Sequence, residues 1–335
     1  MGMRAAASDL RKSQVVSQPP LLEGPHQGPD APPPRLGFAR RIRLSRQPAW
    51  MFTMPTILIL AAITVVPGLF LYYISLFDYN IGQPLSSRRW VGLENYWRLL
   101  SGEDSAFWPA VFTTLLFVAI TVSATLVFGL ILALALDRLR RGAGFFATLL
   151  IVPMVVTPVM AGLLWRLMFN NLLGVVNAFL APFGLEQNWL GSPKIAILSV
   201  SIVEAWQWTP FVALILYAGL RALPEGPIEA AQLDGASGWK MLRFVLLPML
   251  RPIMGLVIAL RVIDGLKIFD TAFALTQGGP GNATETLGLR VFHTGLYQTG
   301  LIGRASAMAV MLLVLVTICF RYVGKYLNRA EEMKG

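Results

Sequence analysis

The sequence predicts an all-α membrane protein with six transmembrane helices. Of its 335 residues, 55% are hydrophobic and only 14% are charged, which is far more apolar than an ordinary globular domain. Residues 51–77 form an uncharged run that is longer than the roughly 20 residues a helix needs to cross hydrocarbon. Five further apolar segments follow it, so the chain is expected to cross a membrane repeatedly.

The expected spans lie at about 51–77, 107–136, 144–168, 195–220, 244–263 and 302–323. An even number of spans places both termini on the same side of the membrane. Lys and Arg are concentrated in the two tails and in the connections that follow the second and fourth spans, so the positive-inside rule predicts that both termini are cytoplasmic. The transmembrane domain is therefore expected over residues 48–330.

Residues 1–47 are rich in Pro, Gly, Ser and Arg and show no apolar periodicity, which predicts a disordered cytoplasmic tail. The tail also lacks the apolar middle region of a cleavable signal peptide. The first span is therefore expected to be retained.

The formal net charge of +10 raises the question of a nucleic-acid partner. The cations are scattered along the edges of the spans, where they would face anionic lipid, so no nucleic-acid binding is expected. A single cysteine, Cys319, excludes an intrachain disulfide and a CxxC metal site. His26 and His293 are too few for a histidine-based metal site or proton relay, and neither has a plausible partner nearby in sequence.

Residues 225–243, between the fourth and fifth spans, are conspicuously polar and are predicted to face the cytoplasm. Glu225 and Glu229 place negative charge near the positive end of a new helix that begins after Pro224. Gly235 and Gly238 then allow a sharp turn or a close backbone approach. We expect a short helix, a bend and a second helix that enters the membrane.

The stretch EAAQLDGASGWKMLRFVLLPMLRP, residues 229–252, resembles the EAA loop of permease subunits in bacterial ABC importers. Val245 stands where that family often has Ile. Residues 91–100, 204–224 and 267–287 are similar to carbohydrate-uptake permeases related to the maltose permease pair. The resemblance covers roughly residues 50–330.

This resemblance implies that the loop is a coupling helix that docks into a groove of a cytoplasmic ATPase, with Glu229 meeting a cationic residue of the ATPase. The residues implied in coupling are Glu229, Ala230, Ala231, Asp234, Gly235, Leu247 and Pro248. The implied partners are a second permease, two copies of the nucleotide-binding ATPase and an extracytoplasmic solute-binding protein, in the bacterial inner membrane. No cofactor is expected in this chain, because no GxxxxGK[ST] pattern occurs, so ATP and Mg²⁺ would bind to the ATPase.

The implied cargo is a sugar, a sugar derivative or a polyol. Ionisable residues inside spans are costly and are usually functional or paired, and aromatic rings and amides suit a sugar. The candidates for the substrate path are Glu204, Trp206, Gln207 and Thr209 in the fourth span and Arg261, Asp264 and Lys267 at the outer end of the fifth. The long outer segments 78–106 and 264–303 are the expected docking surface for the binding protein.

Several alternatives stay open. Arg261, Asp264, Lys267 and Asp270 recur every three residues with alternating sign, so on a helix they can pair with each other, and this interpretation is favoured. Trp206 and Trp208 can equally be interface anchors. Arg261 and Lys267 could instead serve an anion such as glycerol phosphate. A helix lying on the membrane surface, a stand-alone channel and a membrane enzyme fit less well, because the loop lacks a broad apolar face and no convergent catalytic set is present.

Overall fold

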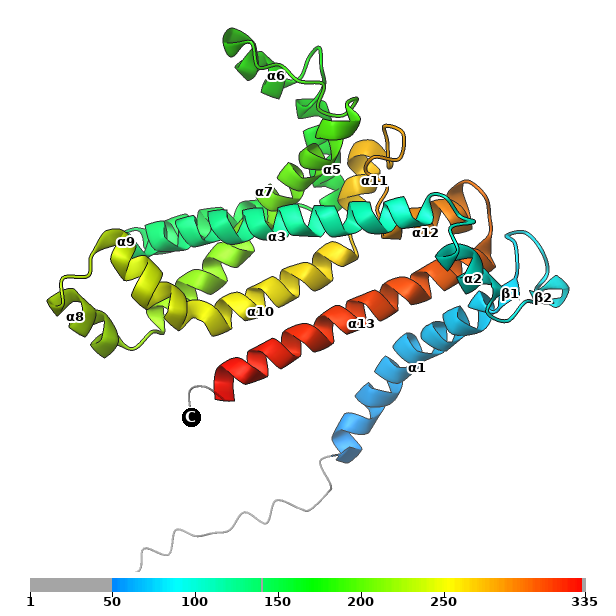
Figure 1. Ribbon diagram of the computed structural model, residues 1–335, viewed down its shortest axis with the longest axis horizontal. Coiled ribbons are helices and arrows are strands. Elements are labelled where there is room, and N and C mark those ends of the chain that lie inside the picture. The colour runs from blue at the N-terminus through cyan, green and yellow to red at the C-terminus, as the bar shows by residue number, and fades with distance from the viewer. Residues whose placement is uncertain (1–49, 140, 333–335) are drawn as a thin grey trace, which may run out of the picture. The chain divides into compact units, whose positions relative to one another are not determined.

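A computed structural model describes residues 50–139 and 141–332, and these residues are predominantly helical (Figure 1). The chain divides into two compact units, Met1–Ile57 and Leu58–Gly335. The described part of the first unit is the start of helix α1, Trp50–Ser75. The tail expected at residues 1–47 lies outside the described residues.

A small structured segment follows α1. Strands β1, Phe77–Asp78, and β2, Arg89–Trp90, pair antiparallel, which adds a short ladder to the predicted all-helical fold. Helix α2, Glu94–Leu100, packs beneath them, because the Asn95 side-chain amide donates to the backbone oxygens of Ser75 and Phe77, both at 2.9 Å. A 3₁₀ turn at Leu85–Ser87 completes the segment.

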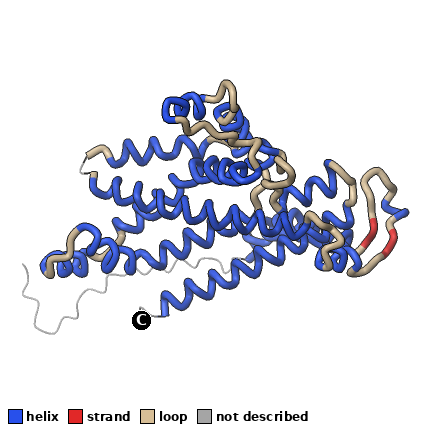
Figure 2. The backbone as a smooth tube through the Cα atoms, turned by 45° about the horizontal axis from the view of Figure 1, so that its top comes forward, coloured by secondary structure: helices blue, strands red, loops and turns tan. Residues whose placement is uncertain are grey.

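Four long helices form the bundle: α3, Phe107–Arg138; α7, Pro193–Arg221; α10, Leu247–Leu266; and α13, Ile302–Glu332. Helix α3 packs along α7, while α10 lies against both α3 and α13 (Figures 1 and 2). Phe117 of α3, Val200 and Leu216 of α7 and Leu250 of α10 are all buried in the contacts between these helices.

Small residues let the helices approach each other. A Cβ atom on Gly129 of α3 would lie 2.6 Å from Cγ1 of Val212 on α7, and one on Gly219 of α7 would lie 2.6 Å from Cδ1 of Ile253 on α10. Helix association in a membrane depends on such close packing, because lipid tails are as apolar as the side chains and supply no hydrophobic driving force.

The segment expected to form one span at 144–168 is broken. Helix α4, Ala143–Val155, and helix α5, Pro158–Met168, are bent by 90° relative to each other. Thr157 is extended, with φ −64° and ψ 143°, because a residue that precedes proline is sterically pushed out of the helical region. Among the described residues, five helices are long and apolar enough to cross a membrane, and a sixth span results if the bent pair counts as one.

Short elements connect the long helices. Helix α6, Val175–Leu180, and a 3₁₀ turn at Ala181–Phe183 lie between α5 and α7. Between α10 and α13 the chain forms α11, Asp270–Thr276, and α12, Leu287–Phe292, which continues into a π-helical turn at His293–Tyr297. Helices α5 and α11 pack so closely that a Cβ atom on Gly162 would lie 2.7 Å from Cβ of Ala274.

Candidate functional site

The loop between α7 and α10 projects from one end of the bundle, opposite the end that carries α12 (Figure 1). It contains α8, Glu225–Leu233, and α9, Gly238–Met241, and a π-helical turn at Leu242–Leu246 leads into α10. A short helix, a bend and a second helix that continues into a long apolar helix are what the sequence led us to expect for this segment.

Most of the residues implied in coupling are exposed on this loop. Glu229, Ala230 and Asp234 are exposed, and Ala231 is half-buried. Leu233, 90% exposed, adds an apolar side chain to the same projecting helix. Leu247 and Pro248 lie elsewhere, half-buried in the first turn of α10. The loop thus offers a small-residue surface with acidic and apolar side chains around it.

Glycine ends α8 for a conformational reason. Gly235 has φ +80°, which glycine adopts without the steric cost that a Cβ atom imposes, and a Cβ atom there would meet nothing within 4 Å. The Gly235 N–H donates to the Gln232 oxygen at 3.0 Å and the Ala236 N–H donates to the Ala231 oxygen at 2.8 Å, which is a Schellman motif. The sharp turn that the sequence allowed is therefore present, and no described residue of this chain approaches the Gly235 Cβ position within 4 Å.

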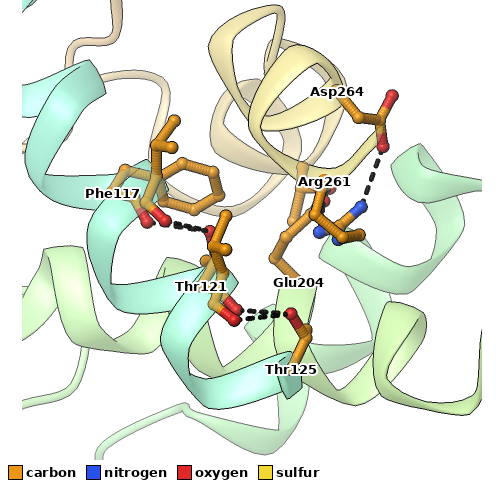
Figure 3. Close-up of polar contacts among 9 residues, drawn as sticks. Phe117, Thr121, Thr125, Glu204, Arg261 and Asp264 are labelled. Atoms are coloured by element: carbon orange, nitrogen blue, oxygen red, sulfur yellow. Dashed lines mark hydrogen bonds and ion pairs between the residues drawn. The ribbon is translucent and has the colours of Figure 1, made fainter. Parts of the chain in front are cut away.

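A buried charged cluster joins α7 to α10 (Figure 3). Arg261 of α10 donates to Glu204 of α7 at 3.1 Å and to Asp264 of its own helix at 2.9 Å. The Arg261 and Glu204 side chains are 2% and 7% exposed, whereas that of Asp264 is 45% exposed. Two carboxylates therefore surround one buried guanidinium.

Neighbouring groups complete this cluster. The Thr271 hydroxyl of α11 donates to the second carboxylate oxygen of Glu204 at 3.4 Å, and the Arg261 guanidinium carbon lies 5.1 Å from the Trp208 ring centroid. Thr121 and Thr125 of α3 lie beside Glu204 in Figure 3, but each hydroxyl donates to a carbonyl of its own helix at 2.8 Å. The polar groups left for a solute are thus those on the exposed side of the cluster.

Two small cavities open on that side. One, of about 240 Å³, is bounded by Pro158 of α5, by Glu204 and Trp208, and by residues 267–271. The other, of about 280 Å³, has Trp208, Arg261, Asp264 and Lys267 in its wall, together with apolar residues of α7 and α10. Both cavities share Trp208, Asp264 and Lys267, so an indole face, a carboxylate and an ammonium group line one polar surface.

The predicted pairing of alternating charges along one helix is only partly present. Arg261 and Asp264 pair as expected, but the extension to Lys267 and Asp270 is wrong, because α10 ends at Leu266 and the helical spacing is lost there. Lys267 and Asp270 are exposed and form no ion pair with any described residue. Both line the 240 Å³ cavity instead.

The other three candidates for the substrate path lie away from this surface. Trp206 and Thr209 line an apolar groove of about 630 Å³ between α3, α4 and α7. Gln207 is buried, and its amide donates to the Val156 oxygen at 2.6 Å, at the break between α4 and α5. The structure therefore brings Glu204, Arg261, Asp264 and Lys267 together and leaves Trp206, Gln207 and Thr209 outside.

Pro158 and Thr271 were missed by the sequence reasoning. Pro158 is the first residue of α5, and Thr271 lies in the first turn of α11. Only the packing of α5 and α11 against α7 brings them to Glu204, so no local pattern marks them.

A second buried network lies at the end of the bundle that carries α12. His293 Nδ1 is 2.8 Å from a carboxylate oxygen of Glu285, and Arg290 donates to Asp104 at 2.8 Å. The prediction that His293 has no partner nearby in sequence is wrong, because the loop that precedes α12 turns Glu285 back against it. This network ties the segment before α3 to α12, and its groups are too enclosed to form an open site.

Comparison with known proteins places these features in context. A family model described as a binding-protein-dependent transport system inner membrane component matches residues 125–332. The trehalose/maltose transport system permease protein MalF of Thermococcus litoralis is 34% identical over 282 residues, which cover 83% of this chain and 93% of that protein. The sn-glycerol-3-phosphate transport system permease protein UgpA of Agrobacterium fabrum is 34% identical over 246 residues, which cover 71% and 82%.

Among solved structures, the chain resembles one in a crystal structure of a bacterial ABC transporter involved in the import of the acidic polysaccharide alginate. The TM-score is 0.71 at 20% sequence identity, and the match covers 84% of this chain and 95% of that chain. At this level of identity, the likeness concerns the fold.

Proposed function

The chain belongs to the family of binding-protein-dependent transport system inner membrane components, and we propose that the cargo of its importer is a sugar, a sugar derivative or a polyol. It is a permease subunit of an ATP-driven importer and a multi-pass protein of the bacterial inner membrane. With a second permease it forms the path that the cargo takes.

The charge balance around the two cavities supports a neutral cargo. Glu204, Asp264 and Asp270 face Arg261 and Lys267, so the two cavities carry no excess of positive charge that would select an anion. The Trp208 ring and groups that can hydrogen-bond line the open side. The face of a sugar stacks well on an indole, and its hydroxyls pair with carboxylates and ammonium groups.

Glycerol phosphate is the second candidate, and one observation favours it. The Lys267 ammonium has no ion-pair partner among the described residues and lines both cavities, so it is free to meet a phosphate. Asp264 and Asp270, which border the same space, would repel the same anion. The neutral cargo therefore remains the first candidate.

The polar loop is proposed to receive the energy for transport. In this proposal both termini are cytoplasmic, α8 docks on a separate ATPase that holds ATP and Mg²⁺, and Glu229, Ala230, Ala231 and Asp234 form the contact. Gly235 sets the turn that presents α8, and Leu247 and Pro248 begin the helix that carries the motion to Arg261. The exposure of α8 and the continuity of the chain from Gly238 to Leu266 support this arrangement. The chain itself performs no catalysis.

The test is uptake by the importer reconstituted in proteoliposomes with its second permease, two ATPase copies and the solute-binding protein. We expect ATP-dependent uptake of a neutral disaccharide, and we expect Lys267→Gln to reduce that uptake without abolishing it, because the glutamine amide can still donate a hydrogen bond to a hydroxyl. Uptake of glycerol phosphate that Lys267→Gln abolishes would establish the second candidate. ATP-independent uptake by the chain alone would refute the permease proposal.

A further inference from the structure

A compact lobe, residues 169–192, links α5 to α7 and projects beyond them at the top of Figure 1. Its backbone is held by asparagine side chains. Asn177 accepts hydrogen bonds from the Gln187 N–H at 3.1 Å and from the Trp189 indole at 2.8 Å, and it donates to the Gln187 oxygen at 3.0 Å. Asn171 donates to Asn188 at 2.8 Å. The lobe is therefore an ordered element that its own hydrogen bonds hold together.

The largest exposed side chains of the lobe are apolar. Leu172 and Leu173 are 93% and 90% exposed, and Phe179 and Phe183 are 75% and 68% exposed. Glu186 is the one charged residue in the sequence of the lobe. Exposed polar residues lie among them, at Asn170, Asn171 and 186–188, while Asn177 is buried. The large apolar side chains are nevertheless exposed to a degree that water does not favour, so another surface is expected to cover them.

Lipid is a poor cover for this lobe. Residues 169–174 and 184–192 have irregular backbone, and irregular segments in contact with hydrocarbon leave amide and carbonyl groups without hydrogen-bond partners. A protein surface can supply those partners and also bury the apolar side chains.

The position of the lobe indicates which protein covers it. The lobe connects α5 and α7, and these two helices also supply Pro158, Glu204 and Trp208 to the wall of the 240 Å³ cavity. The exposed side chains of Lys267 and Asp270 line the same cavity. Open charges are costly against lipid, so this side of the bundle must also face protein or a water-filled path. In a path built by two permeases, the side of the bundle that carries Lys267 and Asp270 faces the second permease. The lobe extends this side beyond α5 and α7.

The solute-binding protein is the less suitable occupant. It must dock and leave in every cycle, and interfaces that form and dissociate are more polar than permanent ones. Residues 78–106 offer such a surface, with Arg88, Arg89 and Arg98 beside exposed Glu94 and Glu103. The lobe lacks comparable charges.

We propose that lobe 169–192 is a permanent docking surface for the second permease, with Phe179 and Leu172 buried in the contact. This inference rests on the proposed function, since it requires that the chain works in a pair of permeases. It assigns the apolar lobe to the pair and the charged segment 78–106 to the binding protein.

Site-specific photo-crosslinking in the assembled importer tests the proposal. In a Cys319→Ser background, Phe179→Cys and Trp97→Cys are each labelled with benzophenone maleimide and irradiated with and without the solute-binding protein. Phe179→Cys is expected to crosslink to the second permease in both conditions, and Trp97→Cys to the binding protein when it is present. A Phe179→Cys adduct with the binding protein alone, or with no protein, overturns the proposal.

A matched pair of charge substitutions gives a second measurement. Phe179→Asp is expected to lower the fraction of second permease that co-purifies at least about tenfold, because buried aromatic anchors dominate protein interfaces. Gln187→Glu adds the same charge to an exposed position of the same lobe and is expected to leave that fraction unchanged. Equal retention of the second permease by both variants refutes the inference. If the wild-type importer transports normally in that case, the docking role of the lobe is refuted and the proposed permease function is not.

Discussion

Arg261 and Glu204, 57 residues apart in sequence, form a 3.1 Å ion pair that joins α10 to α7 with both side chains almost completely buried. Removing one partner of a buried pair costs about 3–5 kcal/mol when the other charge is left uncompensated, and the lower end applies here because the half-exposed Asp264 still pairs with Arg261 at 2.9 Å. Glu204→Gln is therefore expected to lower the free energy of unfolding by about 3 kcal/mol, measured by thermal unfolding of the purified protein.

Asp264→Asn is the control, because the Asp264 side chain is 45% exposed and solvent weakens its share of the pairing. A loss of about 1 kcal/mol or less is expected. If both variants are equally destabilised, the burial of the Glu204 pair is not what stabilises the contact between the two helices.

The turn at Gly235 is predicted to be intolerant of any side chain. Gly235→Ala forces a Cβ atom into the left-handed region, at a cost of roughly 1–2 kcal/mol, and is expected to unwind the end of α8. Binding-protein-stimulated ATPase activity should fall by roughly tenfold, which is what that cost amounts to in an equilibrium constant. Gly226→Ala, also within α8 and also without neighbours around its Cβ position, should retain activity. Normal stimulation in Gly235→Ala would contradict the proposed role of the turn.

Glu229→Lys tests the contact with the ATPase directly. Glu229 is exposed, so the substitution should leave insertion and thermal stability unchanged. Stimulated ATPase activity and uptake are expected to be lost because the lysine meets a cationic partner. Full coupling in a correctly inserted variant would rule out α8 as the contact.

The crossing of α3 and α7 depends on Gly129. Gly129→Ala places a methyl group 2.6 Å from Val212 and is expected to cost about 1–3 kcal/mol of stability through overpacking. Gly144→Ala, where a Cβ atom meets nothing within 4 Å, is the matched control and should be near neutral. Thermal unfolding of the two variants in the same detergent distinguishes them.

Topology gives a further prediction, since both termini are proposed to be cytoplasmic. A reporter that is active only in the periplasm, fused after Arg141 in the connection between α3 and α4, should give no signal. The same reporter fused after Ser192, at the end of the lobe and outside the Asn177 hydrogen bonds, should give a strong one. The reverse pattern would invert the orientation and remove α8 from the cytoplasm.

The elements predictable from the sequence were those with a local signature. The apolar runs mark the long helices, and the Pro224 to Gly238 stretch marks a helix and a turn. The pairing of Glu204 with Arg261 had no such signature, because it depends on how α7 crosses α10. Gln207 follows Glu204 by three residues in α7, but its amide donates to the Val156 oxygen, so two polar residues one helical turn apart have different partners.

The broken third segment shows the same limit. Composition alone reads residues 144–168 as one apolar run, while the extended Thr157 before Pro158 separates two helices at 90°. The proline was visible in the sequence. The close packing of α5 on α11 at Gly162 and Ala274 accompanies the bend, and no local pattern reveals that contact.

Asn177 makes one exposed region of this protein unsuitable for engineering. Its amide oxygen accepts two hydrogen bonds and its nitrogen donates to two backbone oxygens, which is the full capacity of the group, and three of these four bonds reach Gln187 or Trp189. Exposed connections usually accept epitope tags and inserted residues. Here an insertion between Asn177 and Gln187 would separate the groups that these hydrogen bonds join and would destabilise the lobe. We therefore also expect the length of this loop to vary little among relatives.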